Sequence, residues 1–137
     1  MTLLTRAAAA AGALLAAAGL LTASPAHAAS RDAFPGNWLY LTVTKGDARS
    51  SDTRGTLLLC DPPQGHARAA EACAELGAAH GDIGRVPVRS GFCTMIWAPV
   101  TVRARGQWEG RPVKFQETYS SHCVMRARTG SVFALDG

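Results

Sequence analysis

Several motifs that are common in enzymes and metal-binding proteins are missing from this sequence of 137 residues. It has no CxxC pair, and His66, His80 and His122 do not show the spacing of zinc ligands, so we expect no metal site. It also has no GxSxG or HExxH motif, and its Ser, His and Asp residues occur without catalytic context. We therefore do not expect an enzyme, and we expect no cofactor.

Dense blocks of a single charge are also missing. Without its first 28 residues the chain has 13 basic and 10 acidic residues, a net charge of +3, and the positive residues are scattered. Nucleic-acid binding would need a clustered positive patch with interleaved aromatic residues. The charges are therefore interpreted as solvated surface, and no nucleic-acid partner is expected.

A long apolar run occurs only near the N-terminus. Arg6 precedes a run of Ala, Gly and Leu that ends near Leu21, and Ala26-His27-Ala28 provides small residues at the positions that a signal peptidase reads. A membrane anchor is the alternative, but the run of about 15 residues is shorter than the roughly 20 that a spanning helix needs. We predict a secretory signal peptide over residues 1–28 and one domain over residues 29–137, secreted and extracellular, with no membrane contact after cleavage.

The domain has four cysteines, and an even number in an exported protein predicts two disulfides. Spacing alone does not choose among the three connectivities that four cysteines allow. The four are Cys60, Cys73, Cys93 and Cys123.

Hydrophobic periodicity predicts an α+β domain with an antiparallel sheet of about five strands and one or two short helices. The predicted strands are 38–44, 55–60, 100–105, 113–119 and 131–135, with turns at 61–65 and 106–110. A short helix is predicted from near Ala67 to Gly77, with Cys73 on its buried face. A bond from Cys73 to Cys60, at the end of the second strand, would join helix to sheet and leave Cys93 with Cys123. That is the economical pairing.

The stretch Gly91-Phe92-Cys93-Thr94-Met95-Ile96-Trp97-Ala98-Pro99-Val100 is the most informative part of the chain. If Cys93 is bonded to Cys123, the disulfide restrains the chain two residues before Met95, and Pro99 with the next strand restrains it afterwards. A protease could bind such a loop by strand addition, with Met95 in its main specificity pocket. The alternative is that Phe92 and Met95 are buried core residues, as most apolar residues are.

The same stretch resembles the reactive region of the Streptomyces subtilisin inhibitor-like family of secreted serine protease inhibitors, which has the pattern Cys-Pro-Met-Val-Tyr-Asp-Pro-Val. Three further segments of the chain resemble this family, so the similarity covers nearly all of the mature domain. They are Cys60 to His66 with Ala72-Cys73-Ala74-Glu75-Leu76, the tract Trp108 to Cys123, and the ending Ser131-Val132-Phe133-Ala134.

The resemblance implies a fold, a site and partners. It implies a five-stranded antiparallel sheet with two short helices, the disulfides Cys60–Cys73 and Cys93–Cys123, and a homodimer. It also implies a reactive bond between Met95 and Ile96 that is presented to subtilisin-like serine proteases. The implied protease-contact loop is Gly91, Phe92, Cys93, Thr94, Met95, Ile96, Trp97 and Ala98.

The chain departs from the family pattern at several positions. Thr94 replaces a proline and gives up some rigidity, and Ser121 stands where the family has an asparagine that braces the loop. Ala98 replaces an aspartate, which would shift preference on the leaving-group side. Ala67 replaces a proline, and a residue or two is missing between Cys60 and His66, both in a loop away from Met95.

The side chains of the loop favour one class of target protease. Met95 is long, flexible and uncharged, so it suits a broad apolar pocket and not a pocket that selects a cation. Phe92, three residues earlier, would fill the large apolar subsite of a subtilisin. The competing hypothesis is an extracellular binding or structural module, or a crosslinking substrate, without inhibitory activity. Trp38, Tyr40 and Trp97 could then form a ligand patch, although a place in the sheet core is the simpler interpretation of the first two.

Overall fold

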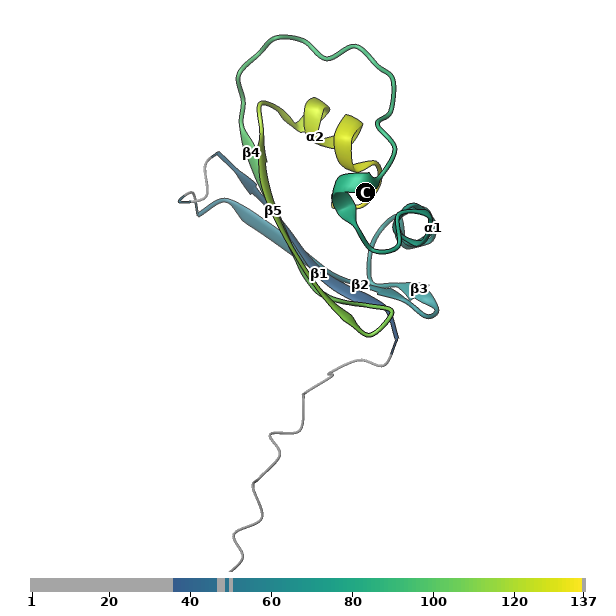
Figure 1. Cartoon of the computed structure of the whole chain (residues 1–137). Helices are drawn as coiled ribbons and strands as arrows, with labels where there is room; N and C mark the ends of the chain where they lie inside the picture. Colours follow the sequence, from purple (N-terminus) through teal and green to yellow (C-terminus); the bar gives the residue numbers. More distant parts are fainter. Residues whose placement is uncertain (1–35, 47–48, 50, 137) are drawn as a thin grey trace, which may run out of the picture. The chain divides into compact units, whose positions relative to one another are not determined.

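The structure, a computed structural model, describes residues 36–46, 49 and 51–136 (Figure 1). The predicted signal peptide lies outside the described residues. Within them, no helix combines the length and the apolar character that crossing a membrane requires. The elements are β1 (Trp38–Lys45), β2 (Thr53–Cys60), β3 (Pro63–Gln64), α1 (Ala69–Ala78), the 3-10 helix η1 (Ile83–Arg85), β4 (Val100–Trp108), β5 (Arg111–Tyr119) and α2 (His122–Thr129).

The five strands form one antiparallel sheet in the order β3-β2-β1-β4-β5. Side chains alternate between its two faces, so Leu39 and Leu41 of β1 are fully buried while Tyr40 between them is half exposed. Ala104 of β4 is paired with Leu41 and is buried on the same face. The predicted antiparallel α+β fold is confirmed, but Tyr40 lies outside the core.

Both helices cover the face of the sheet that carries the core (Figure 1). Leu76 of α1 and Met125 of α2 are fully buried in one cluster with the inward side chains of β1 and β4. The opposite face carries Arg103 and Arg105, which are exposed. The sheet therefore has one face packed against helices and one face in solvent, as antiparallel sheets commonly have.

The predicted strand over residues 131–135 is wrong. This segment follows the end of α2 at Gly130 and turns through hydrogen bonds from Val132 N to Thr129 O and from Ala134 N to Ser131 O. Ser131 to Ala134 are buried at four consecutive positions because they fill the space between the helices and the sheet, and Phe133 stacks on Phe115 with ring centroids 6.2 Å apart.

The fifth strand comes instead from the segment that was predicted as a turn. Pro63 and Gln64 pair with Cys60 and Leu59, so β3 is a two-residue edge strand. The hairpin between β4 and β5 is also tighter than predicted, because β4 continues through Gly106 to Trp108 and only Glu109 and Gly110 remain for the turn.

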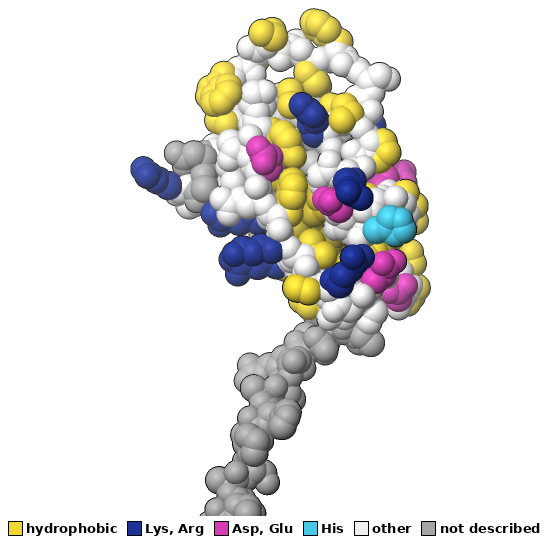
Figure 2. All heavy atoms as spheres, in the orientation of Figure 1, with side chains coloured by type: hydrophobic (Ala, Val, Ile, Leu, Met, Phe, Trp, Pro, Cys, Tyr) yellow, Lys and Arg dark blue, Asp and Glu magenta, His cyan; other side chains and the backbone are white. Residues whose placement is uncertain are grey.

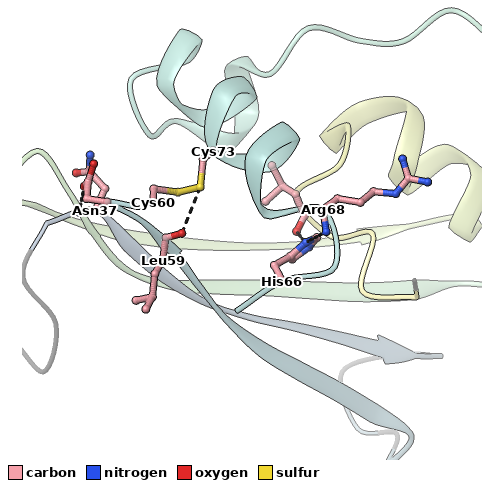
Figure 3. Close-up of a disulfide and its surroundings, with 8 residues drawn as sticks. Asn37, Leu59, Cys60, His66, Arg68 and Cys73 are labelled. Atoms are coloured by element: carbon pink, nitrogen blue, oxygen red, sulfur yellow. Dashed lines mark hydrogen bonds between the residues drawn. A yellow bond between two sulfur atoms is a disulfide. The ribbon is translucent and has the colours of Figure 1, made fainter. Parts of the chain in front are cut away.

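A disulfide joins β2 to α1, as Figure 3 shows. The sulfur atoms of Cys60 and Cys73 are 2.05 Å apart, and the Cys73 sulfur lies 3.5 Å from the carbonyl oxygen of Leu59. Next to it His66 is buried at the start of the turn into α1, where its Nδ1 accepts a hydrogen bond from Arg68 N and its Nε2 donates one to Val132 O. These contacts hold α1 and the C-terminal segment against the sheet.

Candidate functional site

The chain between η1 and β4 forms a long loop without regular secondary structure, which arches over α2 from the helices to the sheet (Figure 1). Val86 at its start is buried, but from Val88 to Trp97 its large apolar side chains are strongly exposed, and hydrophobic atoms line its outer edge in Figure 2. The hypothesis that Phe92 and Met95 are core residues is therefore wrong. The exposed fractions are 91% for Phe92, 100% for Met95, 68% for Ile96 and 74% for Trp97.

A disulfide attaches this loop to α2 on the N-terminal side of Met95. Cys93 is bonded to Cys123, with the sulfurs 2.01 Å and the Cα atoms 5.7 Å apart. Cys123 is the second residue of α2, whose first turn is capped by the Ser121 hydroxyl accepting a hydrogen bond from Val124 N at 3.2 Å. The covalent restraint therefore ends on a capped helix rather than on another loop.

On the C-terminal side of Met95, backbone hydrogen bonds attach the loop to the residues that directly follow β5 and β1. Ala98 N donates to Ser120 O at 3.0 Å, and Gly46 N donates to Pro99 O at 2.7 Å. Val100 then begins β4 and is buried. Residues 94–97 make no hydrogen bond to any other residue that the structure describes. The exposed tip is thus a short span held at Cys93 and at Ala98.

The departures from the family pattern can now be placed. Thr94 is exposed within residues 94–97, the span held only at its two ends. Ser121 uses its hydroxyl to cap α2, and among the described residues its side chain makes no hydrogen bond to the loop. Ala98 is exposed, and its backbone rather than its side chain makes the contact to Ser120. In this chain the tip of the loop, residues 94–97, is held by the disulfide before it and by backbone hydrogen bonds after it.

The loop has no groups for acid–base or metal chemistry. No residue from 90 to 99 is charged, and the described part of the chain contains no group of three or more His, Cys, Asp or Glu residues placed to hold a metal ion. What the loop offers is an extended backbone and a row of apolar side chains.

Sequence reasoning missed three residues that hold the loop in place. Gly46 and Ser120 hold its C-terminal side, and Arg89 holds its N-terminal side through a hydrogen bond from its backbone N to Ala127 O at 2.8 Å. Each of these residues either lies far from the tip of the loop in the sequence or bonds to a residue that does. No local motif marks them.

Comparisons with known proteins agree with this geometry. The sequence profile of the subtilisin inhibitor-like family matches residues 35–121. The chain is 57% identical over 124 residues to a Streptomyces avermitilis protein named as a candidate serine protease inhibitor, with 90% of this chain and 84% of that protein covered. It is 40% identical over 121 residues to a subtilase-type protease inhibitor of Streptomyces coelicolor, with 85% and 83% covered.

A solved structure is also similar, that of Streptomyces caespitosus sermetstatin in complex with Bacillus licheniformis subtilisin. The TM-score is 0.57 at 37% sequence identity, and the match covers 71% of this chain and 96% of that one. The profile match, the curated relatives and the solved structure lead to the same conclusion: the chain belongs to the subtilisin inhibitor-like family.

Proposed function

We propose that this protein is a secreted, substrate-like inhibitor of subtilisin-type serine endopeptidases and that Met95–Ile96 is its reactive bond. The observation that carries the proposal is a fully exposed Met95 between two anchors, the Cys93–Cys123 disulfide before it and the Ala98–Ser120 hydrogen bond after it. Gly91 to Ala98 is the surface that would contact the protease. A relative named as a protease inhibitor and a similar chain solved in complex with subtilisin support the same assignment.

Restraint on both sides of the bond explains how a substrate can act as an inhibitor. The protease binds the extended loop by strand addition, and the ordering cost is small because the loop is already held. After attack on the Met95 carbonyl, the new amino group of Ile96 stays close to the acyl group because Ala98 remains bonded to Ser120. Its high effective concentration favours religation over hydrolysis.

The direct test is a titration of subtilisin with the purified protein, followed by mass spectrometry. We expect loss of protease activity at a near-stoichiometric ratio, with slow cleavage only between Met95 and Ile96. Rapid degradation of the protein at many bonds would contradict the proposal, as would full protease activity at excess inhibitor.

The disulfide supplies a variant for the same titration. In the Cys93→Ser/Cys123→Ser protein the covalent restraint beside Met95 is lost, while the Cys60–Cys73 bond of the fold is kept. We expect this variant to be cleaved as an ordinary substrate. If it inhibits as durably as the natural protein, the disulfide is not the restraint.

We further propose that the protein is extracellular and forms a homodimer, both as the family resemblance implies. The N-terminal apolar run with its small residues before Ala29 supports secretion. Mass spectrometry of the protein recovered from the culture medium tests this point, with Ala29 as the expected first residue.

A second candidate function follows from the exposed apolar tip alone. Phe92, Ile96 and Trp97 would also suit a binding module that holds an extracellular partner without inhibiting a protease. The titration separates the two, because a pure binding module leaves subtilisin active and has no reason to be cut at a single bond.

A further inference from the structure

The N-terminal arm of the loop has an anchor of its own, at Arg89. Its backbone N donates to Ala127 O in α2 at 2.8 Å. Its guanidinium donates to the Ser131 hydroxyl at 3.0 Å and is ion-paired with Glu75 of α1. One residue of the arm is thus attached to both helices and to the C-terminal segment.

The site that receives Arg89 is built by other contacts. Glu75 accepts a hydrogen bond from Ser131 N at 2.6 Å, and the Ser131 hydroxyl, which is fully buried, donates to Glu71 at 2.8 Å. The carboxylate of Glu75 also packs on Gly130, where an added Cβ would lie 2.3 Å from its oxygen. The carboxylate is therefore oriented by α1 and the C-terminal segment, and only one fifth of the Glu75 side chain is exposed.

Phe92 lies between this anchor and the disulfide. Only Ser90 and Gly91 separate it from Arg89, and Cys93 follows it directly. The Phe92 side chain is 91% exposed, so packing against the domain does not fix its position. Its place is set by the two attached residues on either side. Met95, in contrast, is held by Cys93 and by the anchors at Ala98 and Pro99.

We propose that Arg89 is a positioning residue for Phe92: it holds the N-terminal arm so that Phe92 can enter an apolar subsite of the protease. The inference rests on the proposed inhibitory function. A free arm would have to be ordered on binding, and that ordering would cost part of the affinity gained from the aromatic ring. Glu75 and Ser131 both accept from the same guanidinium nitrogen, Nη2, and so fix the end of the Arg89 side chain.

The test is a double-mutant cycle on inhibition of subtilisin. We expect Arg89→Ala and Phe92→Ala each to weaken inhibition about tenfold, as the loss of a charged hydrogen-bond network or a buried ring would. In the Arg89→Ala background, we expect Phe92→Ala to cost only about twofold, because the two act on one contact. If the two losses simply multiply, Arg89 does not position Phe92 and the inference is overturned.

Three controls make the outcome specific. Arg85→Ala removes an equally charged residue that is ion-paired with Asp82 and, among the described residues, has no ion pair or hydrogen bond to α1 or α2, so we expect inhibition unchanged. Arg89→Lys keeps the charge on a more flexible stem with rotatable donors, so we expect a loss between the natural protein and Arg89→Ala. A Met95→Ala cycle with Arg89→Ala should multiply, since other anchors hold Met95. Coupling as strong at Met95 as at Phe92 would mean general loosening of the loop and would contradict the inference.

Failure of this inference and failure of the proposed function give different results. If the natural protein does not inhibit subtilisin, the proposed function fails and the inference falls with it. If it inhibits and the cycle is multiplicative, only the inference fails. Amide hydrogen exchange adds a readout without protease: Arg89→Ala should raise exchange at the amide of residue 89, which donates to Ala127 O, while the amide of Ala98, which donates to Ser120 O, stays unchanged.

Discussion

At the scale of single residues, we expect substitution of Met95 to have the largest effect on which protease is inhibited. It is fully exposed at the tip, and its surroundings on the inhibitor place no demand on its chemistry. We expect Met95→Lys to leave the fold intact and to redirect inhibition toward trypsin, whose specificity pocket binds a cation. Inhibition of subtilisin should fall roughly 10- to 100-fold, because a charged side chain would replace the apolar one that fills the specificity pocket of the protease. Inhibition assays against both proteases measure the exchange.

Thr94→Lys is the matched control for this prediction. It places the same charge on the same exposed span, one residue before the proposed reactive bond. We expect it to confer no trypsin inhibition. If Met95→Lys leaves the target spectrum unchanged, or if Thr94→Lys redirects it equally well, Met95 is not the primary specificity residue.

At the scale of elements, the turn that leads into α1 depends on a neutral histidine. Burial lowers the pKa of His66 and the charge of Arg68 lowers it further, while the hydrogen bond to the Val132 carbonyl opposes both. His66 Nδ1 also accepts from Arg68 N, a bond that a protonated ring cannot make. The turn between β3 and α1 is thus built around the neutral ring.

This arrangement predicts a loss of stability in mild acid. Unfolding frees His66 to bind a proton near its ordinary pKa of about 6.5, so the unfolded state binds more protons below that pH. The contribution is therefore complete above the unfolded pKa and is lost as the pH falls toward the lowered folded pKa. We expect the melting temperature to fall between about pH 7 and pH 5, and to fall less in His66→Gln.

His80→Asn is the control, because His80 is exposed and sits at a positive φ of 53°, which asparagine tolerates. It should keep the full pH dependence. Glu71 does not interfere in this range: the Ser131 hydroxyl and Arg68 lower its pKa, so its own contribution is lost only in stronger acid. Equal pH dependence in His66→Gln and the natural protein would contradict the assignment.

The elements also show what could be predicted from sequence. Strands β1 and β4 were predictable because one buried face forces alternation, as in Leu39 and Leu41. The segment 131–135 was not, since a short apolar run fits a buried turn as well as a strand. Helix α2 has only Met125 and Thr129 buried, too few to show a helical period. The exposed tip followed from Met95 between Cys93 and Pro99.

The disulfide anchor of the loop could be predicted, but its hydrogen-bonded anchors could not. Arg89 is one of twelve arginines, and its role depends on contacts to Glu75 and Ser131, which lie 14 and 42 residues away. Nothing in the local sequence distinguishes it from Arg85. Side-chain chemistry identified the site and its disulfide, whereas the hydrogen-bonded restraints depend on tertiary contacts.

At the scale of the whole molecule, the sheet face that the helices leave bare is positively charged. Arg105 is paired with Lys114 across β4 and β5, and Arg103 lies two residues along, hydrogen-bonded to Gln116 at 3.0 Å. Among the described residues no carboxylate forms an ion pair with any of these three cations. The other exposed arginines of the sheet edges, Arg54 and Arg111, are ion-paired.

This charge pattern predicts how the proposed homodimer responds to salt. Neither α1 nor α2 covers this face of the sheet (Figure 1), so we expect two copies to meet there with cations facing each other. Like charges oppose association, and salt screens them. Light scattering should therefore show more dimer at about 0.15 M salt than at about 0.01 M, where the Debye length is roughly 30 Å.

Arg105→Glu turns that salt dependence into a test of the interface. It places an anion opposite the cations of a second copy, so it should strengthen the dimer at low salt, whereas Arg128→Glu on the exposed side of α2 should not. A monomer under every condition would contradict the homodimer itself. A dimer that responds neither to salt nor to Arg105→Glu would place the interface on another surface. If the dimer buried the cations of this face, reversing the charge at Arg105 would change its stability.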